Sequence, residues 1–146
     1  MTSGELSLKP LRASTGRLAI VICPSNPYFS VDPILALSGL RDWIKATGGP
    51  VVAVLPIVGA AAIRGPAAEI MGELGLQPFA TSVARHYNGL VDGFVIDRAD
   101  VDSSEEIASM GMRVLSTQTV MQTMEDRVGL AHECLALAED LLRGTA

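Results

Sequence analysis

The stretch RLAIVICPSNPYFSVDP (residues 17–33) sets the pattern that the rest of the chain follows. An aliphatic run at 17–23 is followed by a loop of proline, serine and asparagine residues. Asp32 and Pro33 then favour a helix start, because an aspartate can cap a helix and proline costs nothing at the first helical position. The stretch therefore predicts a strand, a loop and a helix in that order.

The same order recurs along the chain. Aliphatic runs predict further strands at residues 51–55, 93–96 and 113–116. Helical patterns that end at or near glycines fall at 33–47 (broken at Ser38 and Gly39), 66–75, 81–87 and 103–111, with a last helix after residue 119. The alternation predicts an α/β, Rossmann-like layered fold with a mostly parallel sheet of about four strands flanked by helices. We expect an irregular N-terminal segment at 1–16 and a single α/β domain at 17–146.

Two predicted helices carry a local start signal. Ser103 with Glu106, and Thr119 with Gln122, match the capping box. The last helix also shows one apolar stripe at spacings of three and four. That stripe comprises Val120, Met124, Val128, Ala131, Leu135, Ala138 and Leu142.

Composition and charge narrow the class of protein. Hydrophobic residues make up 49% of the 146 residues and the net charge is −5, which argues against a nucleic-acid partner. Residues 1–90 carry a net +2 and residues 91–146 a net −7, so an anionic ligand would prefer the first half, although the acidic half is also explained by solvated helix faces. No signal peptide or membrane span is expected, which predicts a cytoplasmic protein. Cys23 and Cys134 lack metal or redox spacing and are expected to be free, buried thiols.

Ligands of parallel sheets bind beyond the carboxyl ends of the strands, so the loops there are the candidate site. After the first strand, Ser25, Asn26 and Ser30 offer donors suited to phosphate or sugar, ahead of a helix start. After the second strand, Gly59, Arg64 and Gly65 form a possible anion clamp. An ordinary turn and a solvent-facing arginine explain the two loops equally well.

Two further residues are weaker candidates. His86 ends a predicted helix that could face the ligand, or it is a structural histidine at a helix C-terminus. Asp97 ends a strand where it could meet a metal ion or a ribose hydroxyl, or it caps a turn. No cluster with metal-ligand spacing is present in the sequence, so no metal ligands are assigned.

Four motifs in order resemble the C-terminal half of the 2-phospho-L-lactate transferases, over about residues 17–135. They are CPSNPYFSVDPIL (23–35), PIVGAAAIRGPAAEIM (56–71), VARHYNGLVDGFVID (83–97) and TMEDRVGLA (123–131). The resemblance implies a transferase of coenzyme F-420 biosynthesis. Such an enzyme moves a phospholactyl or phosphoenolpyruvyl group from a guanosine-diphosphate-linked donor to the deazaflavin Fo, with release of GMP and with magnesium as cofactor. By the same resemblance Ser25, Asn26 and Ser30 contact substrate, and Arg64-Gly65 stands where the family reads KGP or RGP.

The chain also departs from the family pattern. Gly59-Ala60 replaces two glycines, and Gln118 stands where an acidic residue is common. The glycine-rich loop with which the family begins has no match among these residues. The resemblance therefore leaves three hypotheses. The chain is a truncated or split transferase that is active only with a complementary N-terminal half, a non-catalytic module that binds nucleotide or deazaflavin, or a remnant without a ligand that its α/β core holds together. Self-association as a homodimer is also expected.

Overall fold

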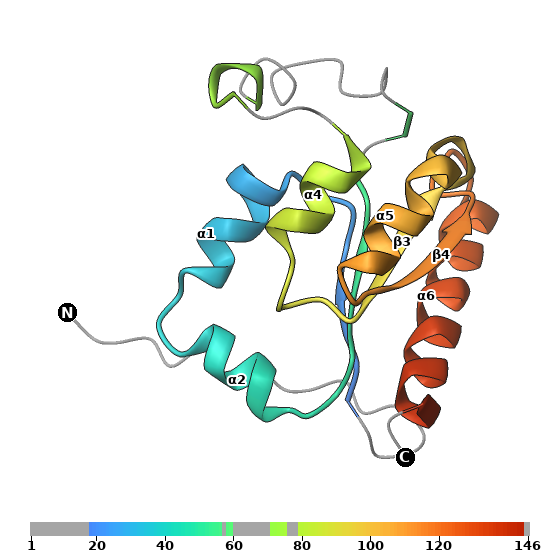
Figure 1. The fold of residues 1–146 in the computed structure, drawn as a ribbon. Helices are drawn as coiled ribbons and strands as arrows, with labels where there is room; N and C mark the ends of the chain where they lie inside the picture. Colours follow the sequence, from blue (N-terminus) through green and yellow to red (C-terminus); the bar gives the residue numbers. More distant parts are fainter. Residues whose placement is uncertain (1–17, 57, 60–70, 76–78, 145–146) are drawn as a thin grey trace.

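Figure 1 shows the computed structural model, which describes residues 18–56, 58–59, 71–75 and 79–144. The strands are β1 (Ile20–Ile22), β2 (Val51–Val54), β3 (Gly93–Asp97) and β4 (Arg113–Thr117). The α-helices are α1 (Asp32–Leu35), α2 (Leu40–Ala46), α4 (Ala80–His86), α5 (Ser104–Ser109) and α6 (Met124–Gly144). Two tighter turns complete the order, the π-helical η1 (Pro27–Val31) and the 3-10 helical η2 (Arg98–Ser103).

The four strands form one parallel sheet in the order β1-β2-β3-β4. Ile20 pairs with Val51, Val52 with Gly93, and Gly93 with Arg113. Consecutive parallel neighbours need a crossover at each step, and the predicted helical segments supply them. The α/β layered fold is therefore confirmed.

Helices cover both faces of the sheet (Figure 1). On one face, Ala53, Phe94 and Ile96 pack in a core with residues of α1, α2, α4 and α5. On the other face, Val52, Val54 and Val95 pack against α6. The central strands are thus buried on both sides, which is why they consist of aliphatic residues rather than an alternating pattern.

The strands lie close to their predicted positions, but β1 is shorter than the predicted 17–23. Its last paired residue is Ile22, opposite Ala53. Cys23 is followed by Pro24, which has no N–H for a ladder bond, so the chain leaves the sheet there. The predicted helix at 66–75 lies mostly outside the described residues; within them, residues 71–73 are helical and the turn ends at Gly75.

The break at Ser38 and Gly39 is confirmed, since α1 ends at Leu35 and α2 begins after Gly39. The predicted cap by Asp32 is wrong. The chain is already coiled in η1 before Asp32, and Asn26 caps that turn instead. Asp32 therefore has helical backbone angles, and its carboxylate pairs with His86.

The capping box predicted at Ser103 is also wrong. Ser103 is the last residue of η2, has helical backbone angles and makes no side-chain cap bond. The Glu106 carboxylate, which the box needs, instead accepts a hydrogen bond from the Arg85 guanidinium. A tertiary ion pair between α4 and α5 thus replaces the local motif.

The predicted cap of the last helix lies one turn too early. Helix α6 begins with a reciprocal box in which the Thr123 hydroxyl accepts the Asp126 N–H at 3.1 Å. The Asp126 carboxylate accepts the N–H groups of Gln122 and Thr123, both at 2.9 Å, and these bonds lower the pKa of Asp126. Thr119 does not cap α6, because it binds Asp97.

The apolar stripe predicted for α6 is largely wrong. The side chains that α6 buries are Leu130, Cys134, Leu137 and Ala138. Of the predicted stripe only Ala138 is fully buried, while Met124, Val128 and Leu135 are exposed. The sequence contains two overlapping apolar patterns on α6, and the sheet covers the one that the periodicity did not favour.

The two cysteines differ in environment. Both are free thiols, but Cys134 is buried between α6 and the sheet whereas Cys23 is exposed, which corrects the expectation that both are buried. Burial raises the pKa of Cys134 to about 11, so this thiol stays protonated at neutral pH. No helix among the described residues combines the length and apolar character needed to cross a lipid bilayer.

Gly93 tests the contact between α6 and the sheet. A Cβ at this position would lie 2.9 Å from Leu141 Cδ1 and 3.0 Å from Leu137 Cδ2. We predict that Gly93→Ala lowers the free energy of unfolding by about 1–3 kcal/mol, measured by urea denaturation. Gly129→Ala is the control, because a Cβ there meets nothing within 4 Å and should stabilise α6 by about 0.5–1 kcal/mol. Equal effects of the two variants would contradict this packing.

Candidate functional site

The carboxyl ends of the strands lie at one edge of the sheet because all four strands are parallel. The structure places at this edge the predicted residues that follow three different strands: Ser25, Asn26 and Ser30 after β1, Gly59 after β2, and Asp97 at the end of β3. Arg64 and Gly65 lie outside the described residues.

Asn26 organises the loop after β1. Its Oδ1 accepts the N–H of Tyr28 at 3.0 Å and the N–H of Phe29 at 3.1 Å. Its main-chain oxygen accepts the N–H of Ser30 at 3.0 Å. The two side-chain bonds use Oδ1 and leave the Nδ2 group out, so a ligand here would meet a fixed amide donor and the hydroxyls of Ser25 and Ser30.

Asp97 connects the ends of β3 and β4. It is only 8% exposed, and its carboxylate accepts the N–H of Ala99 at 3.0 Å, the N–H of Thr119 at 2.9 Å and the Thr119 hydroxyl at 3.1 Å. Burial alone would raise the pKa of Asp97, but these hydrogen bonds outweigh it and hold the pKa below its usual value. Asp97 therefore acts as a turn cap that fixes the β3 and β4 loops relative to each other.

Gly59 ties the loop after β2 to the segment after β3. Its N–H donates to the Asp100 carboxylate at 2.8 Å. Its φ of +62° is a left-handed conformation that glycine adopts without strain. Asp100 lies in η2, which starts directly after Asp97, so the three loops after β2, β3 and β4 are joined by two buried or partly buried carboxylates.

His86 is held against the Asn26 loop. Its Nε2 lies 2.9 Å from Asp32 Oδ1, and its ring centre lies 4.5 Å from that of Tyr28. Partial burial, with a smaller effect of Asp32, raises the pKa of Tyr28. The pair joins α4 to α1 across 54 residues of sequence, so His86 fixes the position of the helix that follows the loop.

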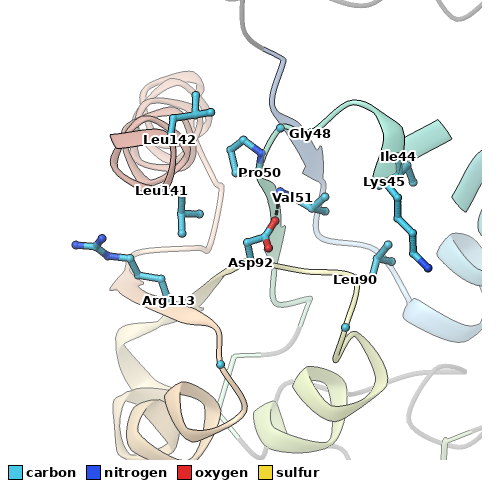
Figure 2. Close-up of a pocket in the computed structure, with 13 residues that line it drawn as sticks. Ile44, Lys45, Gly48, Pro50, Val51, Leu90, Asp92, Arg113, Leu141 and Leu142 are labelled. Atoms are coloured by element: carbon cyan, nitrogen blue, oxygen red, sulfur yellow. Dashed lines mark hydrogen bonds between the residues drawn. The ribbon is translucent and has the colours of Figure 1, made fainter. Parts of the chain in front are cut away.

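A cavity of about 480 Å³ lies at the opposite edge of the sheet, where the strands begin (Figure 2). Its lining includes Lys45, Asp92 and Arg113, and the Asp92 carboxylate accepts the N–H of Val51 at 2.8 Å. None of the candidate site residues that fall in the described part of the chain lines this cavity. The carboxyl edge is thus a surface of loops joined by hydrogen bonds, and it is separate from the cavity.

Comparison with known proteins decides the family. The model of the 2-phospho-L-lactate transferase CofD family matches residues 12–133. The chain belongs to this family. Its resemblance to the transferases, drawn from four motifs, is therefore confirmed.

Similar members of the transferase family come from both bacteria and archaea. The chain is 39% identical over 123 residues to the phosphoenolpyruvate transferase of Streptomyces griseus, covering 84% of this chain and 39% of that protein. It is 37% identical over 122 residues to the 2-phospho-L-lactate transferase of Methanocaldococcus jannaschii, covering 84% and 38%. The match to the enzyme of Methanosarcina barkeri is 32% over 142 residues and covers 97% and 45%. The chain thus spans less than half the length of these relatives.

The described residues of this transferase-family chain do not form a metal site. No group of three or more His, Cys, Asp or Glu side chains among them is arranged to hold a metal ion. The oxygens of Asp97 and Asp100 already accept backbone N–H groups, and the exposed Gln118 beside Thr119 brings no charge. Magnesium does not fit the described part of the carboxyl edge on its own.

Sequence reasoning missed three residues that shape this edge. Asp32, Asp100 and Thr119 each make a contact with a residue at least 22 positions away. Asp100 lies three residues after Asp97 in an acidic stretch, which is the one signal in the sequence that points to its role. The sequence gives no sign of the partners of Asp32 and Thr119. Both residues match the pattern of a helix cap, which predicts a local role instead.

Asp97 offers a test of this edge. Because its pKa is lower in the folded chain than in the unfolded chain, its stabilising effect is complete above the unfolded-state pKa and is lost as the pH falls through the folded-state pKa. We predict that Asp97→Asn lowers stability at pH 7 by about 1–3 kcal/mol and that the gap to the wild type narrows in acid. Urea denaturation at several pH values measures both. The exposed Asp102→Asn is the control, and a pH-independent gap for Asp97→Asn would contradict the assignment.

Proposed function

We propose that the chain contributes the carboxyl-edge loops of a phosphotransferase in coenzyme F-420 biosynthesis. The proposed reaction moves a phospholactyl or phosphoenolpyruvyl group from a guanosine-diphosphate-linked donor to the deazaflavin Fo and releases GMP. The observation that carries the proposal is the family match over residues 12–133, together with relatives named for each of the two phosphorylated acids. The proposal places the protein in the cytoplasm.

The chemistry needs alignment more than a protein nucleophile. The terminal ribityl hydroxyl of Fo forms a bond to the phosphorus that carries the organic acid, and the phosphoanhydride bond to GMP breaks. Holding that hydroxyl in line with the leaving group accounts for most of what a site must supply. The rigid loop around Asn26 suits this task, because its backbone is fixed before any ligand arrives.

The negative charge at the carboxyl edge means that binding a diphosphate substrate needs a positive countercharge. Asp97, Asp100 and Asp102 all lie in or beside η2, so this part of the edge repels a diphosphate. Arg64, which lies outside the described residues, would supply a countercharge. Magnesium, when bound, would neutralise the diphosphate, with ligands drawn from the substrate or from parts of the protein beyond the described residues.

A second function is favoured by one observation, the short span of the chain relative to its relatives. A chain that covers 39% of the Streptomyces griseus enzyme would bind nucleotide or deazaflavin through the same loops without turnover. The two functions differ in a simple assay. Both predict binding of GDP or Fo, whereas only the transferase predicts release of GMP once the complementary part of the fold is supplied.

The transferase assay uses the 146-residue chain with the guanosine-diphosphate-linked donor, Fo and magnesium, and measures GMP and the phosphodiester product of Fo by mass spectrometry. We expect no detectable product from the chain alone, because it covers 39% of the length of the relative named phosphoenolpyruvate transferase. Product from the chain alone would show that these residues suffice for catalysis. Binding of neither GDP nor Fo would remove both functions.

Asn26 tests the binding loop. We predict that Asn26→Ala weakens the affinity for GDP about tenfold, measured by calorimetry, because it removes the amide donor and the cap of Tyr28 and Phe29. Asn26→Asp keeps an acceptor for the cap but adds a negative charge, so it should weaken GDP binding while preserving stability. The control is Asn88→Ala, an exposed residue beyond the end of α4. Unchanged GDP affinity in both Asn26 variants would remove this loop from the site.

A further inference from the structure

Helix α6 has more apolar surface than the sheet covers. Met124, Val128 and Leu135 are 65%, 49% and 51% exposed. Spacings of four and seven place the three side chains on one side of the helix. Apolar groups of this size gathered along one side of a helix mark a surface that another element covers.

The contacts of α6 show which way this side faces. Leu137 and Leu141 lie over Gly93 in β3. Helix α6 runs antiparallel to the strands on the face opposite the crossover helices, and because those crossovers are right-handed, the Cys134 side of α6 faces β1 and the Leu137 side faces β4. At about 100° per residue, the exposed stripe lies about a third of a turn beyond the buried centre, on the side of Cys134 and away from Leu137. The stripe therefore faces the β1 side of the sheet.

The sheet is incompletely covered at the same place. Val21 in β1 is 37% exposed, while its neighbours Ile20 and Ile22 pack into the core on the opposite face. Cys23 is exposed as well. Figure 1 shows α6 as the helix on this face, whereas α1, α2, α4 and α5 cover the other. We call the exposed side chains of Val21 and Cys23, from the edge strand and the residue after it, and of Met124, Val128 and Leu135, from the helix, the α6 trough.

The edge of β1 adds a backbone signal. Among the described strands, β1 has a neighbour on one side only. The Ile20 N–H donates to Pro50 on the β2 side, so the alternate residue, Val21, directs its N–H and C=O away from β2. An uncovered strand edge beside an apolar trough fits one more strand with one more helix, the unit from which the rest of this sheet is built.

We propose that the α6 trough is the docking surface for the remainder of the transferase fold, through a strand that pairs with β1 and a helix that packs against Met124, Val128 and Leu135. The partner chemistry follows from the relatives, in which these aligned residues account for 39% or 38% of the protein. The remaining polypeptide binds here whether it belongs to the same protein or to a separate chain. The inference depends on family membership and not on the proposed substrates.

The test is co-expression of the 146-residue chain with the part of the Streptomyces griseus relative that lies outside the 123 aligned residues. Co-purification on a tag carried by the 146-residue chain is the readout. We expect a one-to-one complex with the wild-type chain. Leu135→Glu and Val128→Glu each place a charge in the trough and should reduce the co-purified partner at least tenfold.

Ala136→Glu is the matched control, because Ala136 is exposed on α6 next to Leu135 but points about 100° away from it. The control should retain the complex, and thermal melts of all three variants should match the wild type, since the changed residues are exposed. No co-purification with the wild-type chain would overturn the proposal. So would a self-association of the chain that the two trough variants abolish, because that outcome assigns the trough to a second copy. Complex formation can succeed even where GDP fails to bind, so the two proposals fail separately.

Discussion

The burial of β2 and β3 on both faces is the constraint on which the rest of the structure depends. Val52, Val54 and Val95 point into one core, while Ala53 and Phe94 point into the other. Such strands have no room for a charged or hydrogen-bonding side chain along their length. Polar chemistry is therefore displaced to the ends of the strands, and helices are required on both sides. The burial of β2 and β3 on both faces thus explains both the position of the candidate site and the presence of helices on each face.

The polar side chains at the carboxyl edge are used first to build the edge itself. Asp97 and Asp100 bind main-chain N–H groups of neighbouring loops, and Asn26 binds those of its own loop. These bonds give a partner to backbone N–H groups that would otherwise lose their hydrogen bonds to water on folding. What remains for a ligand is a set of fixed hydroxyl and amide groups on a stiff frame, which suits the orientation of a substrate better than proton transfer.

The sequence predicted the fold well where one signal acted alone. Each aliphatic run became a strand within a few residues of its predicted ends, and glycines end three of the helices, since Gly48, Gly89 and Gly111 all have positive φ. Prediction failed where two patterns overlapped. Helix α6 contains two apolar stripes and two threonines that could cap it, and only tertiary contacts choose between them. Thr119 does not cap α6 because it hydrogen-bonds to Asp97, and Leu137 is buried because Gly93 leaves room for its side chain. The pairing of Asp32 with His86 could not be predicted from local sequence either, because it depends on a tertiary contact between residues 54 positions apart.

The proline after Asn26 has a chemical consequence for the lifetime of the loop. Asparagine loses its amide mainly when the following backbone nitrogen, freed of its hydrogen, attacks the side-chain carbonyl and closes a succinimide ring. Pro27 has no such N–H, so the residue that shapes the β1 loop is shielded from this ageing reaction. Asn88, by contrast, is exposed and followed by the unhindered Gly89. Spontaneous deamidation would therefore fall on the far edge of the sheet and spare the loop that the proposed chemistry needs.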